Sequence, residues 1–288
     1  MKRFLTYASF VRFSHSVFAL PFALTGALLA FHRGTVPTGR EMAVRVAWIV
    51  VAMVAARNAA MGFNRLVDAR YDAQNPRTAM RELPRGMISA REAALFVAIS
   101  AAIFVFAAWQ LGTICFVLSP VALAIVFWYS LAKRVTSYTQ LFLGLAMAVA
   151  PVGGWLAAGG RSGWEPWLLA LAIGCWVGGF DVLYACQDLA VDRAQGLHSI
   201  PVRFGVARSL TISRAMHAIA VVALGLLAPV ADLGWFYLAG VVGVGGLLAY
   251  EQSLVSEHDL SQVKRAFDLN GYVGIMYLVT TAFAIYVG

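Results

Sequence analysis

Long apolar stretches alternate with short polar ones along the whole chain. Nine apolar segments reach the length of about 20 residues that an α-helix needs to cross a lipid bilayer. They lie at approximately 14–31, 43–63, 90–111, 113–130, 137–158, 165–186, 209–229, 233–253 and 267–287. The pattern predicts an all-α, polytopic membrane protein with nine transmembrane helices. Its N-terminal apolar run is expected to be the first of these helices and not a cleaved signal peptide.

Composition supports a lipid environment and narrows the classes of partner. Of the 288 residues, 61% are hydrophobic and 12% are charged, and the mean hydropathy is +0.76. A soluble protein of this size cannot bury so much apolar surface. The formal net charge of +8 would suggest a nucleic-acid partner in a soluble protein, but here the basic residues lie between the apolar segments and indicate topology and anionic partners. The odd number of cysteines, at Cys115, Cys175 and Cys186, argues against disulfides and against a zinc site.

The distribution of basic residues predicts the orientation in the membrane. Most of the 22 lysines and arginines lie in the N-terminal segment and in the connections that follow the second, fourth, sixth and eighth apolar segments. Lysine and arginine accumulate on the cytoplasmic side of membrane proteins, so the N-terminus is expected to be cytoplasmic and the C-terminus external. We therefore expect a multi-pass protein of the cell inner (cytoplasmic) membrane.

Oxygen-bearing side chains recur at the end of the second apolar segment. Asn64, Asp68 and Asp72 are spaced by four residues and, at roughly 100° per residue, fall within an arc of about 80° on one helix face. Such a spacing alone also suits a solvated helix end. Asp188 and Asp192 repeat it 120 residues later, at the end of another apolar segment. Two matched carboxylate motifs indicate a shared function, and the orientation places both on the cytoplasmic side.

Ionisable residues also lie one to two turns before each motif. Tyr184 and Asp181 precede Asp188 by four and seven residues and are expected on the same helix face as Asp188 and Asp192. Arg57 precedes Asn64 by seven residues, on the face of the first motif. An ionisable side chain at this depth costs about 2.5–3.5 kcal/mol on insertion scales, so each needs a partner inside the bundle. Either a structural Arg57–Asp181 ion pair or participation in a substrate site would meet this need.

Two further pairs of residues share a helix face. Tyr129 and Lys133 are four residues apart at the end of the fourth apolar segment, and Arg12 and His15 are three apart at the start of the first. Lys133 alone would suit a topogenic lysine, and Arg12 alone would suit an anchor that reaches the headgroups. The alternative is that each pair lies at an anion-binding site.

Each aspartate motif leads into a polar, proline-containing connection, at residues 72–86 and 195–205. Such segments are too polar to span a bilayer and too long for simple turns, and the first is rich in arginine. They are expected to form ordered caps over the motifs.

Together these motifs resemble the UbiA superfamily of intramembrane prenyltransferases. The resemblance rests on N-x-x-x-D-x-x-x-D at 64–72, Y-x-x-x-K at 129–133 and D-x-x-Y-x-x-Q-D-x-x-x-D at 181–192. It extends along nearly the whole chain, including Asn75–Thr78 and Pro151–Trp155.

Other segments look most like one branch of this superfamily. Arg12–His15, Phe18–Pro21 and Leu197–Pro201 resemble the branch that contains MqnP, a menaquinone-pathway enzyme often labelled as a 4-hydroxybenzoate polyprenyltransferase.

The resemblance implies a single UbiA-like transmembrane prenyltransferase domain over residues 1–288, with nine helices around a central cavity that opens sideways to lipid. It implies that Mg²⁺, or Mn²⁺, holds a polyprenyl diphosphate at the cytoplasmic mouth. The implied metal ligands are Asn64, Asp68, Asp72, Asp188 and Asp192. The implied substrate contacts are Arg12, Asn64, Arg65, Tyr129, Asp181 and Tyr184, and the implied catalytic residues are the four motif aspartates with Lys133.

The implied reaction transfers a polyprenyl group from polyprenyl diphosphate to 4-hydroxybenzoate or 1,4-dihydroxy-6-naphthoate, in ubiquinone or menaquinone biosynthesis. Hard divalent cations bind carboxylate and phosphate oxygens together and, as Lewis acids, stabilise the leaving diphosphate. An apolar chamber lined by rings such as Trp128 and Tyr129 would keep water from the allylic cation and stabilise it through cation–π contacts. The base that removes the ring proton remains open between a motif aspartate and the released diphosphate.

Other functions are possible for a membrane protein with buried charges. Haem, chlorophyllide or glycerophosphate could be the acceptor in the same superfamily. A CDP-alcohol phosphotransferase also places aspartates and metal at a membrane surface, but its glycines are missing around Asp68 and Asp72. A secondary transporter would carry its site near the bilayer midplane. A purely structural membrane protein would leave the two aspartate motifs unexplained. No nucleic acid and no obligate protein partner are expected.

Overall fold

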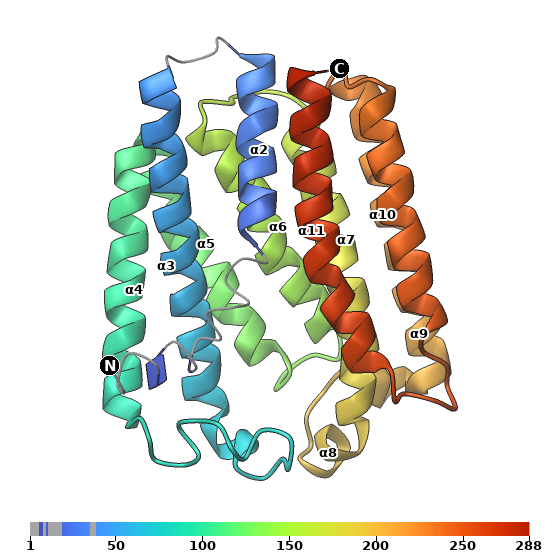
Figure 1. Ribbon diagram of the computed structural model, residues 1–288. Helices are drawn as coiled ribbons and strands as arrows, with labels where there is room; N and C mark the ends of the chain where they lie inside the picture. Colours follow the sequence, from blue (N-terminus) through green and yellow to red (C-terminus); the bar gives the residue numbers. More distant parts are fainter. Residues whose placement is uncertain (1–5, 8–9, 11–18, 35–38, 288) are drawn as a thin grey trace.

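The computed structural model describes residues 6–7, 10, 19–34 and 39–287, and its elements in these ranges are helices (Figure 1). In chain order they are α2 (Leu20–Arg33), α3 (Gly39–Asp72), α4 (Ala90–Leu111), α5 (Thr113–Ala132), α6 (Thr139–Ala157), α7 (Glu165–Ala185), η2 (Cys186–Asp188), α8 (Leu189–Ala194), α9 (Ile200–Val230), α10 (Trp235–Ser253) and α11 (Val263–Tyr286). The prediction of an all-α protein is confirmed for this part of the chain.

Seven helices in the described ranges are long and apolar enough to cross a membrane. α2, with 14 residues, and α10 also coincide with predicted apolar segments but are not among those seven. The chain is therefore a multi-pass membrane protein, and the count of nine spans stays a prediction.

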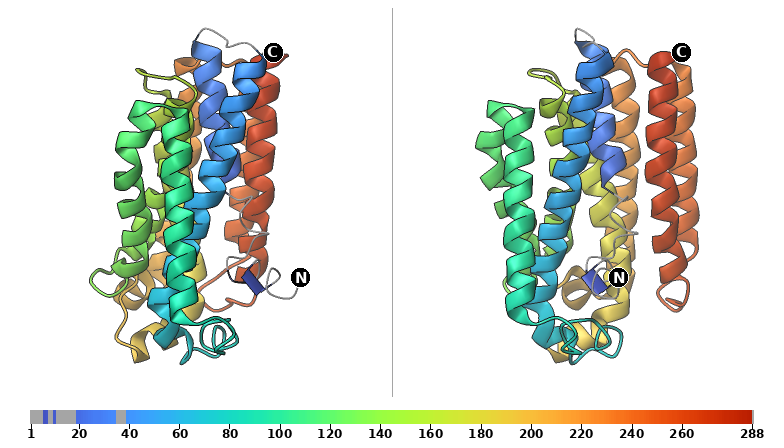
Figure 2. Two further views of the ribbon diagram at one scale, coloured as in Figure 1. Left: turned by 90° about the vertical axis from the view of Figure 1, so that its left-hand side faces the viewer. Right: turned by 60° about the vertical axis from the view of Figure 1, so that its left-hand side comes forward.

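The long helices run alternately up and down, so that their connections gather at two ends of the bundle (Figures 1 and 2). The end of α3, the end of α5, the end of α7 and the short helix α8 lie at the same end. Topology therefore brings both aspartate motifs and the Tyr129–Lys133 pair together. Which end faces the cytoplasm stays a prediction from the distribution of basic residues.

Small residues let three helices approach closely through the middle of the bundle. A methyl group at Gly26 of α2 would meet the carbonyl of Pro151 in α6, and one at Gly154 of α6 would meet the carbonyl of Ala23 in α2. A methyl group at Gly144 of α6 would likewise meet the backbone of α7. Because lipid supplies no hydrophobic force between helices, such backbone-to-backbone packing holds them together.

Large side chains fill the core beside these contacts. The rings of Phe22 in α2 and Trp176 in α7 pack edge to face with centroids 5.1 Å apart, and both are fully buried. Tyr237 of α10 and Tyr277 of α11 join their hydroxyls at 2.9 Å in the same core cluster. The core therefore packs α7, which leads into the second motif, against α2 and joins α10 to α11.

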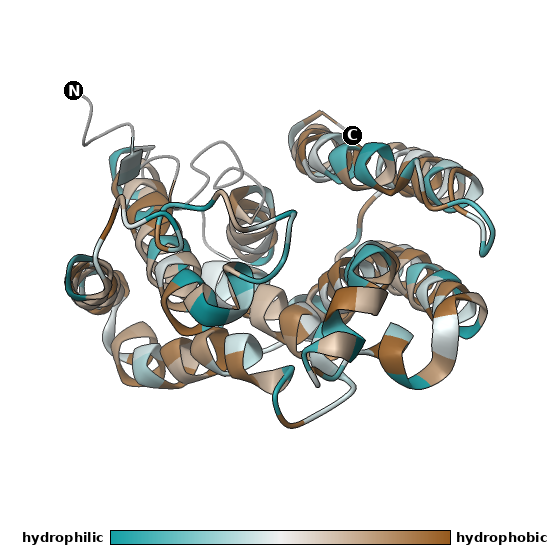
Figure 3. Cartoon of the chain, turned by 90° about the horizontal axis from the view of Figure 1, so that it is seen from below, coloured by the Kyte–Doolittle hydropathy of each residue, from teal (hydrophilic) through white to brown (hydrophobic). Residues whose placement is uncertain are grey.

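The outward faces of the bundle are apolar. Leu95, Ile99, Ile103 and Trp109 of α4 form a stripe of exposed side chains, each at least 45% exposed. Seen from the end that carries the motifs, the connections there are largely hydrophilic in colour and the helices behind them largely hydrophobic (Figure 3). This distribution is typical of a surface that contacts lipid hydrocarbon.

Candidate active site

The first motif lies on the last two turns of α3. Asn64, Asp68 and Asp72 share one face of this helix, as their spacing predicts, and Asp68 and Asp72 are only 3% and 7% exposed. The amide Nδ2 of Asn64 donates to Asp68 Oδ2 at 3.2 Å. Buried carboxylates need compensating charge, and other elements supply it.

The end of α5 supplies two cations to Asp68. Lys133 Nζ donates to Asp68 Oδ2 at 2.6 Å, and Arg134 Nη2 donates to Asp68 Oδ1 at 2.8 Å. Both cations also lie over the ring of Tyr71, at 5.8 and 5.2 Å from its centroid. The Y-x-x-x-K motif is thus brought against the first aspartate motif.

The connection between α3 and α4 joins the two aspartate motifs. Arg81 Nη1 donates to both carboxylate oxygens of Asp72, at 2.7 and 2.8 Å. Arg77 forms a two-pronged contact with Asp188, through Nε at 3.0 Å and through Nη2, and its Nη1 donates to the Tyr184 hydroxyl at 3.2 Å. The expected cap therefore contacts both motifs directly.

Arg77 keeps its charge in this position. Burial alone would lower its pKa, but the hydrogen bond and the negative charge of Asp188 outweigh burial and raise the pKa of Arg77 above its ordinary value. The guanidinium of Arg77 therefore stays protonated beside Asp188.

The second motif does not continue α7 as one regular helix. Asp181 and Tyr184 lie on α7, whereas Asp188 ends the 3₁₀ turn η2 and Asp192 lies on α8. The prediction that these four residues share one α-helical face is therefore corrected, because the chain tightens at Cys186–Asp188. Asp181 and Asp192 still lie within electrostatic range of Asp188.

The second connection is held against the first half of the site. Gln195 Nε2 donates to the carbonyl of Tyr71 at 3.2 Å, and the backbone N–H of His198 donates to the carbonyl of Lys133 at 2.8 Å. These contacts tie the segment after Asp192 to the ends of α3 and α5.

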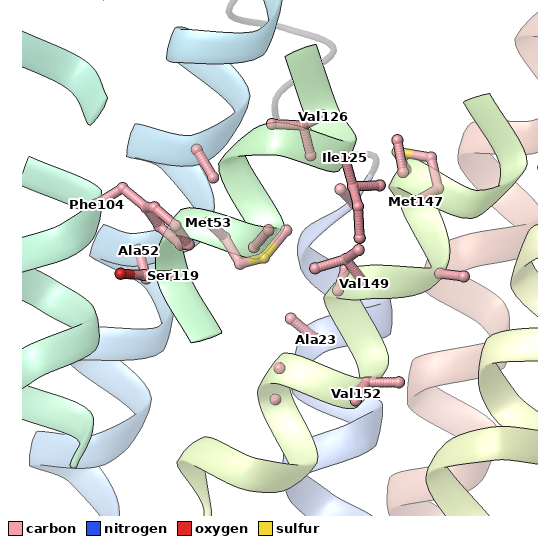
Figure 4. A pocket seen from close by; sticks show the side chains of 18 of the residues that line it. Ala23, Ala52, Met53, Phe104, Ser119, Ile125, Val126, Met147, Val149 and Val152 are labelled. Atoms are coloured by element: carbon pink, nitrogen blue, oxygen red, sulfur yellow. The ribbon is translucent and has the colours of Figure 1, made fainter. Parts of the chain in front are cut away.

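An apolar cavity of about 450 Å³ lies inside the bundle (Figure 4), and Tyr129 of its lining is within electrostatic range of Asp68 and Asp181. Its walls come from α2 to α7 and include Ala23, Met53, Phe104, Val126 and Val149. Such a space suits a hydrocarbon chain and excludes water.

Arg57 and Tyr129 line this cavity, and Arg57 is the one charged residue among its described lining. They lie within electrostatic range of one another, and the buried Arg57 Nε has no hydrogen-bond partner in the described part of the chain. An Arg57–Asp181 ion pair is not present between these two described residues, so the structural pairing considered from the sequence is wrong. Trp128 is also not a cavity residue: it is 44% exposed and packs against Phe142.

The contacts described above do not assign a role to three other predicted residues. Arg65 is buried on α3, at 4% exposure, and its side chain is not without interactions. Arg12 and His15 lie outside the described residues.

The structure shows partners that the sequence did not single out. Arg77, Arg81 and Arg134 each bind a motif aspartate. The arginine-rich connection was expected to cap the motif, but its individual pairings depend on how the loop folds back. Arg134 directly follows the Y-x-x-x-K motif, and that adjacency was the available signal.

The oxygen donors of the site suit a hard divalent cation, although among the described residues they do not lie in one cluster. No group of three or more histidine, cysteine, aspartate or glutamate side chains is close enough to hold a metal within the described ranges. Carboxylates and an amide are nevertheless the ligands that Mg²⁺ prefers, and it commonly uses only one or two carboxylates together with phosphate oxygens. The donor chemistry therefore fits a metal that arrives with a phosphate group.

Comparison with known proteins assigns this arrangement to a family. Residues 19–279 match the model of the UbiA prenyltransferase family. The chain is 31% identical over 240 residues to a 4-hydroxybenzoate octaprenyltransferase of Cronobacter sakazakii, with 82% of each chain covered. It is 32% identical over 226 residues to the enzyme of that name from Tolumonas auensis, with 76% of this chain and 77% of the relative covered.

Solved structures share the fold. A UbiA homologue from Aeropyrum pernix K1 superposes with a TM-score of 0.83 at 34% identity, over 93% of this chain and 96% of the other. A UbiA homologue from Archaeoglobus fulgidus, solved with DMAPP and Mg²⁺, has a TM-score of 0.72 at 18% identity, over 98% and 100% of the two chains. The second comparison concerns the fold alone.

Proposed function

The chain belongs to the UbiA prenyltransferase family, and on that premise we propose that it transfers a polyprenyl group from a polyprenyl diphosphate to a hydroxylated aromatic acid, in a Mg²⁺-dependent reaction. One observation carries this proposal. Two aspartate motifs and their cationic partners meet, and Tyr129, which lies within electrostatic range of Asp68 and Asp181, lines an apolar cavity together with Arg57. The polar end suits a metal-bound diphosphate, and the apolar part suits the prenyl group and the aromatic ring.

Metal ligands come from both motifs in this proposal. Asn64, Asp68, Asp72, Asp188 and Asp192 would hold Mg²⁺, and bound metal would supply Lewis-acid stabilisation of the leaving diphosphate. Asp68, Asp72 and Asp188 pair with cations in the structure. Those cations lie where an anionic substrate would meet them.

The cations of the site bind the diphosphate. Lys133 and Arg77 use side chains that are 27% and 36% exposed, so both can turn towards a bound anion. Arg77 brings a planar guanidinium that matches phosphate oxygens in pairs, and Lys133 brings a compact charge with three donors. These side chains, together with Arg81, would neutralise the charge left on the diphosphate.

The cavity protects the reacting carbon. Removal of diphosphate leaves an allylic cation, which water would capture if it could enter. The apolar walls exclude water, and Tyr129 places an aromatic ring in the lining near the polar end. A ring carbon of the acceptor then attacks the cation and the ring loses a proton.

The acceptor is bound through its carboxylate. Arg57 is the cation of the cavity lining, its Nε lacks a protein partner among the described residues, and a carboxylate would satisfy it. Relatives named as 4-hydroxybenzoate octaprenyltransferases favour 4-hydroxybenzoate. The segments that resemble the menaquinone branch favour 1,4-dihydroxy-6-naphthoate. We assign the site to the cytoplasmic face of the inner membrane on the distribution of basic residues.

A direct comparison of acceptors tests the proposal. Membranes that contain the protein receive one polyprenyl diphosphate, Mg²⁺ and either aromatic acid, and the prenylated product is separated by chromatography. We expect one of the two acids to be prenylated and neither to react in membranes with Asp72→Ala. Product from neither acid would contradict the proposed substrate class.

A further inference from the structure

Arg134 contacts four different residues at the candidate active site. Its Nη2 donates to Asp68 Oδ1 and to the carbonyl of Val67, both at 2.8 Å, and its Nη1 donates to the carbonyl of Ser130 at 2.9 Å. Its guanidinium also lies over the ring of Tyr71. The side chain thus spans from the end of α5 to the end of α3.

This arrangement fixes Arg134 and leaves Lys133 adjustable. Ser130 lies four residues before Arg134, so Arg134 caps a terminal carbonyl of its own helix while it binds α3. Arg77, Arg81 and Lys133 also bind motif aspartates, but among the described contacts their side chains bind no backbone carbonyl. The planar guanidinium of Arg134 can satisfy its three oxygen partners in only one orientation, whereas the ammonium of Lys133 can rotate and still donate hydrogen bonds.

Arg134 and Lys133 bind different oxygens of the Asp68 carboxylate. Arg134 binds Oδ1 of Asp68, whereas Oδ2 accepts from the Lys133 ammonium and the Asn64 amide. When Lys133 turns to an anionic substrate, Arg134 still holds Asp68 in place. Oδ2 is then the oxygen that becomes available to a cation.

Because Asp68 is buried, its carboxylate needs a cationic partner that stays bound. Asp68 is 3% exposed, and a buried carboxylate that loses its ion-pair partner carries an uncompensated charge. Arg134 supplies the remaining charge and keeps the carboxylate from rotating.

We propose that Arg134 is a positioning residue that orients Asp68 so that its Oδ2 can ligate a divalent cation. The inference rests on the proposed function, since it concerns the metal-binding role assigned there to Asp68. Its physical basis is the general behaviour of metal ligands, whose orientation depends on the hydrogen bonds made by their other atoms.

The test measures Mn²⁺ binding and not turnover. The purified full chain in detergent is titrated with MnCl₂ in the presence of inorganic pyrophosphate, and bound Mn²⁺ is followed by electron paramagnetic resonance. Arg134→Gln is expected to weaken Mn²⁺ binding by about 10- to 100-fold, the usual effect of removing a partner of a metal ligand. Arg134→Lys keeps the positive charge but loses the planar guanidinium, so its Mn²⁺ affinity is expected to lie between those of the wild type and Arg134→Gln.

A matched control separates position from charge. Arg208→Gln makes the same change at an exposed arginine of α9 and should leave Mn²⁺ binding unchanged. Thermal unfolding without metal is measured on the same samples, because loss of the contacts to Val67 and Ser130 lowers stability whatever the role of Arg134. Unchanged Mn²⁺ affinity in a folded Arg134→Gln protein would overturn the inference.

Two further outcomes keep the test decisive. If Arg134→Gln does not fold, Arg134→Lys takes its place: weakened binding supports the inference and wild-type affinity overturns it. The Asp68→Asn variant distinguishes a failure of the Arg134 inference from a failure of the metal-binding role of Asp68. Weak binding in Asp68→Asn with normal binding in the Arg134 variants overturns this inference alone, whereas normal binding in Asp68→Asn overturns the metal role of Asp68 and this inference with it.

Discussion

At the scale of single residues, the site is a set of carboxylates that are paired across elements. Asp68 is paired with the end of α5, Asp72 with Arg81 and Asp188 with Arg77, and each cation comes from a segment distant from its partner or folded back onto it. Paired charges can be buried where single charges cannot. In the proposed reaction these cations would turn to the anionic substrate, and a metal ion would take their place at the carboxylates.

Removal of one motif aspartate should nearly abolish prenyl transfer. Loss of a partner of a metal ligand costs about 10- to 100-fold, so loss of a ligand itself should exceed about 100-fold in Asp68→Ala, Asp72→Ala, Asp188→Ala and Asp192→Ala. Initial rates at saturating Mg²⁺ measure this loss. Wild-type rates in any two of the four variants would contradict the assignment of metal ligands.

Lys133 should act on the donor and not on the acceptor. It ends the helix beside Asp68 and is free to turn to a diphosphate oxygen. Lys133→Ala removes a charge-assisted hydrogen bond of about 1.5–3 kcal/mol, which corresponds to roughly a 10- to 100-fold higher KM for the prenyl diphosphate. The KM for the aromatic acid serves as the internal control and should stay within about twofold. A higher acceptor KM with an unchanged donor KM would place Lys133 elsewhere in the reaction.

Arg57 should select for a carboxylate on the acceptor. Arg57→Ala is expected to raise the KM of the aromatic acid by roughly 10- to 100-fold, because the variant loses a charge-assisted pair inside an apolar cavity. The matched measurement uses the same ring without its carboxylate, whose KM should not change. Arg57→Lys should rescue only in part, since lysine lacks the planar fork. An equal effect on both acceptors would assign the carboxylate contact to another residue, with Arg12 the candidate named from the sequence.

At the scale of elements, apolar patterning predicted where the helices are and less well where they end. The segment expected at 43–63 is α3 from Gly39 to Asp72, because its first aspartate motif continues the helix. The segment expected at 209–229 is α9 from Ile200, since a polar stretch with a kink at Gly205 precedes the apolar one. Hydropathy detects lipid contact, whereas a helix continues into water wherever its backbone hydrogen bonds are satisfied.

Close packing between α2 and α6 gives a prediction on stability. Gly154→Ala adds a methyl group that meets the backbone of Ala23, whereas Gly153→Ala adds one with nothing within 4 Å. Both changes raise helix propensity, so Gly153→Ala should be neutral or stabilising by about 0.5–1 kcal/mol, and Gly154→Ala should be destabilising by about 1–3 kcal/mol. Thermal unfolding in one detergent compares them. Equal stability of the two variants would contradict the close approach of these helices.

At the scale of the whole molecule, the sequence predicted which residues meet but not how they pair. The matched spacing of two aspartate motifs and the alternation of helices were enough to place the ends of α3 and α7 at one end of the bundle. The pairings through Arg77 and Arg134 depend on connections that fold back across the site, and periodicity does not describe such segments. Both Trp128 and Tyr129 were expected in the cavity lining, but only Tyr129 lies there. Neighbouring residues on a helix point about 100° apart, and only packing decides which of the two faces inward.

The most direct test of prenyl transfer at this site is the release of diphosphate by the purified protein in lipid nanodiscs. With polyprenyl diphosphate, Mg²⁺ and the preferred aromatic acid, we expect one diphosphate released for each prenylated ring. Release should stop in EDTA and in Asp192→Ala, and it should depend on the acid. Prenylated product formed at the full rate in EDTA, or diphosphate released equally with and without the acceptor, would contradict a metal-dependent transfer to an aromatic ring.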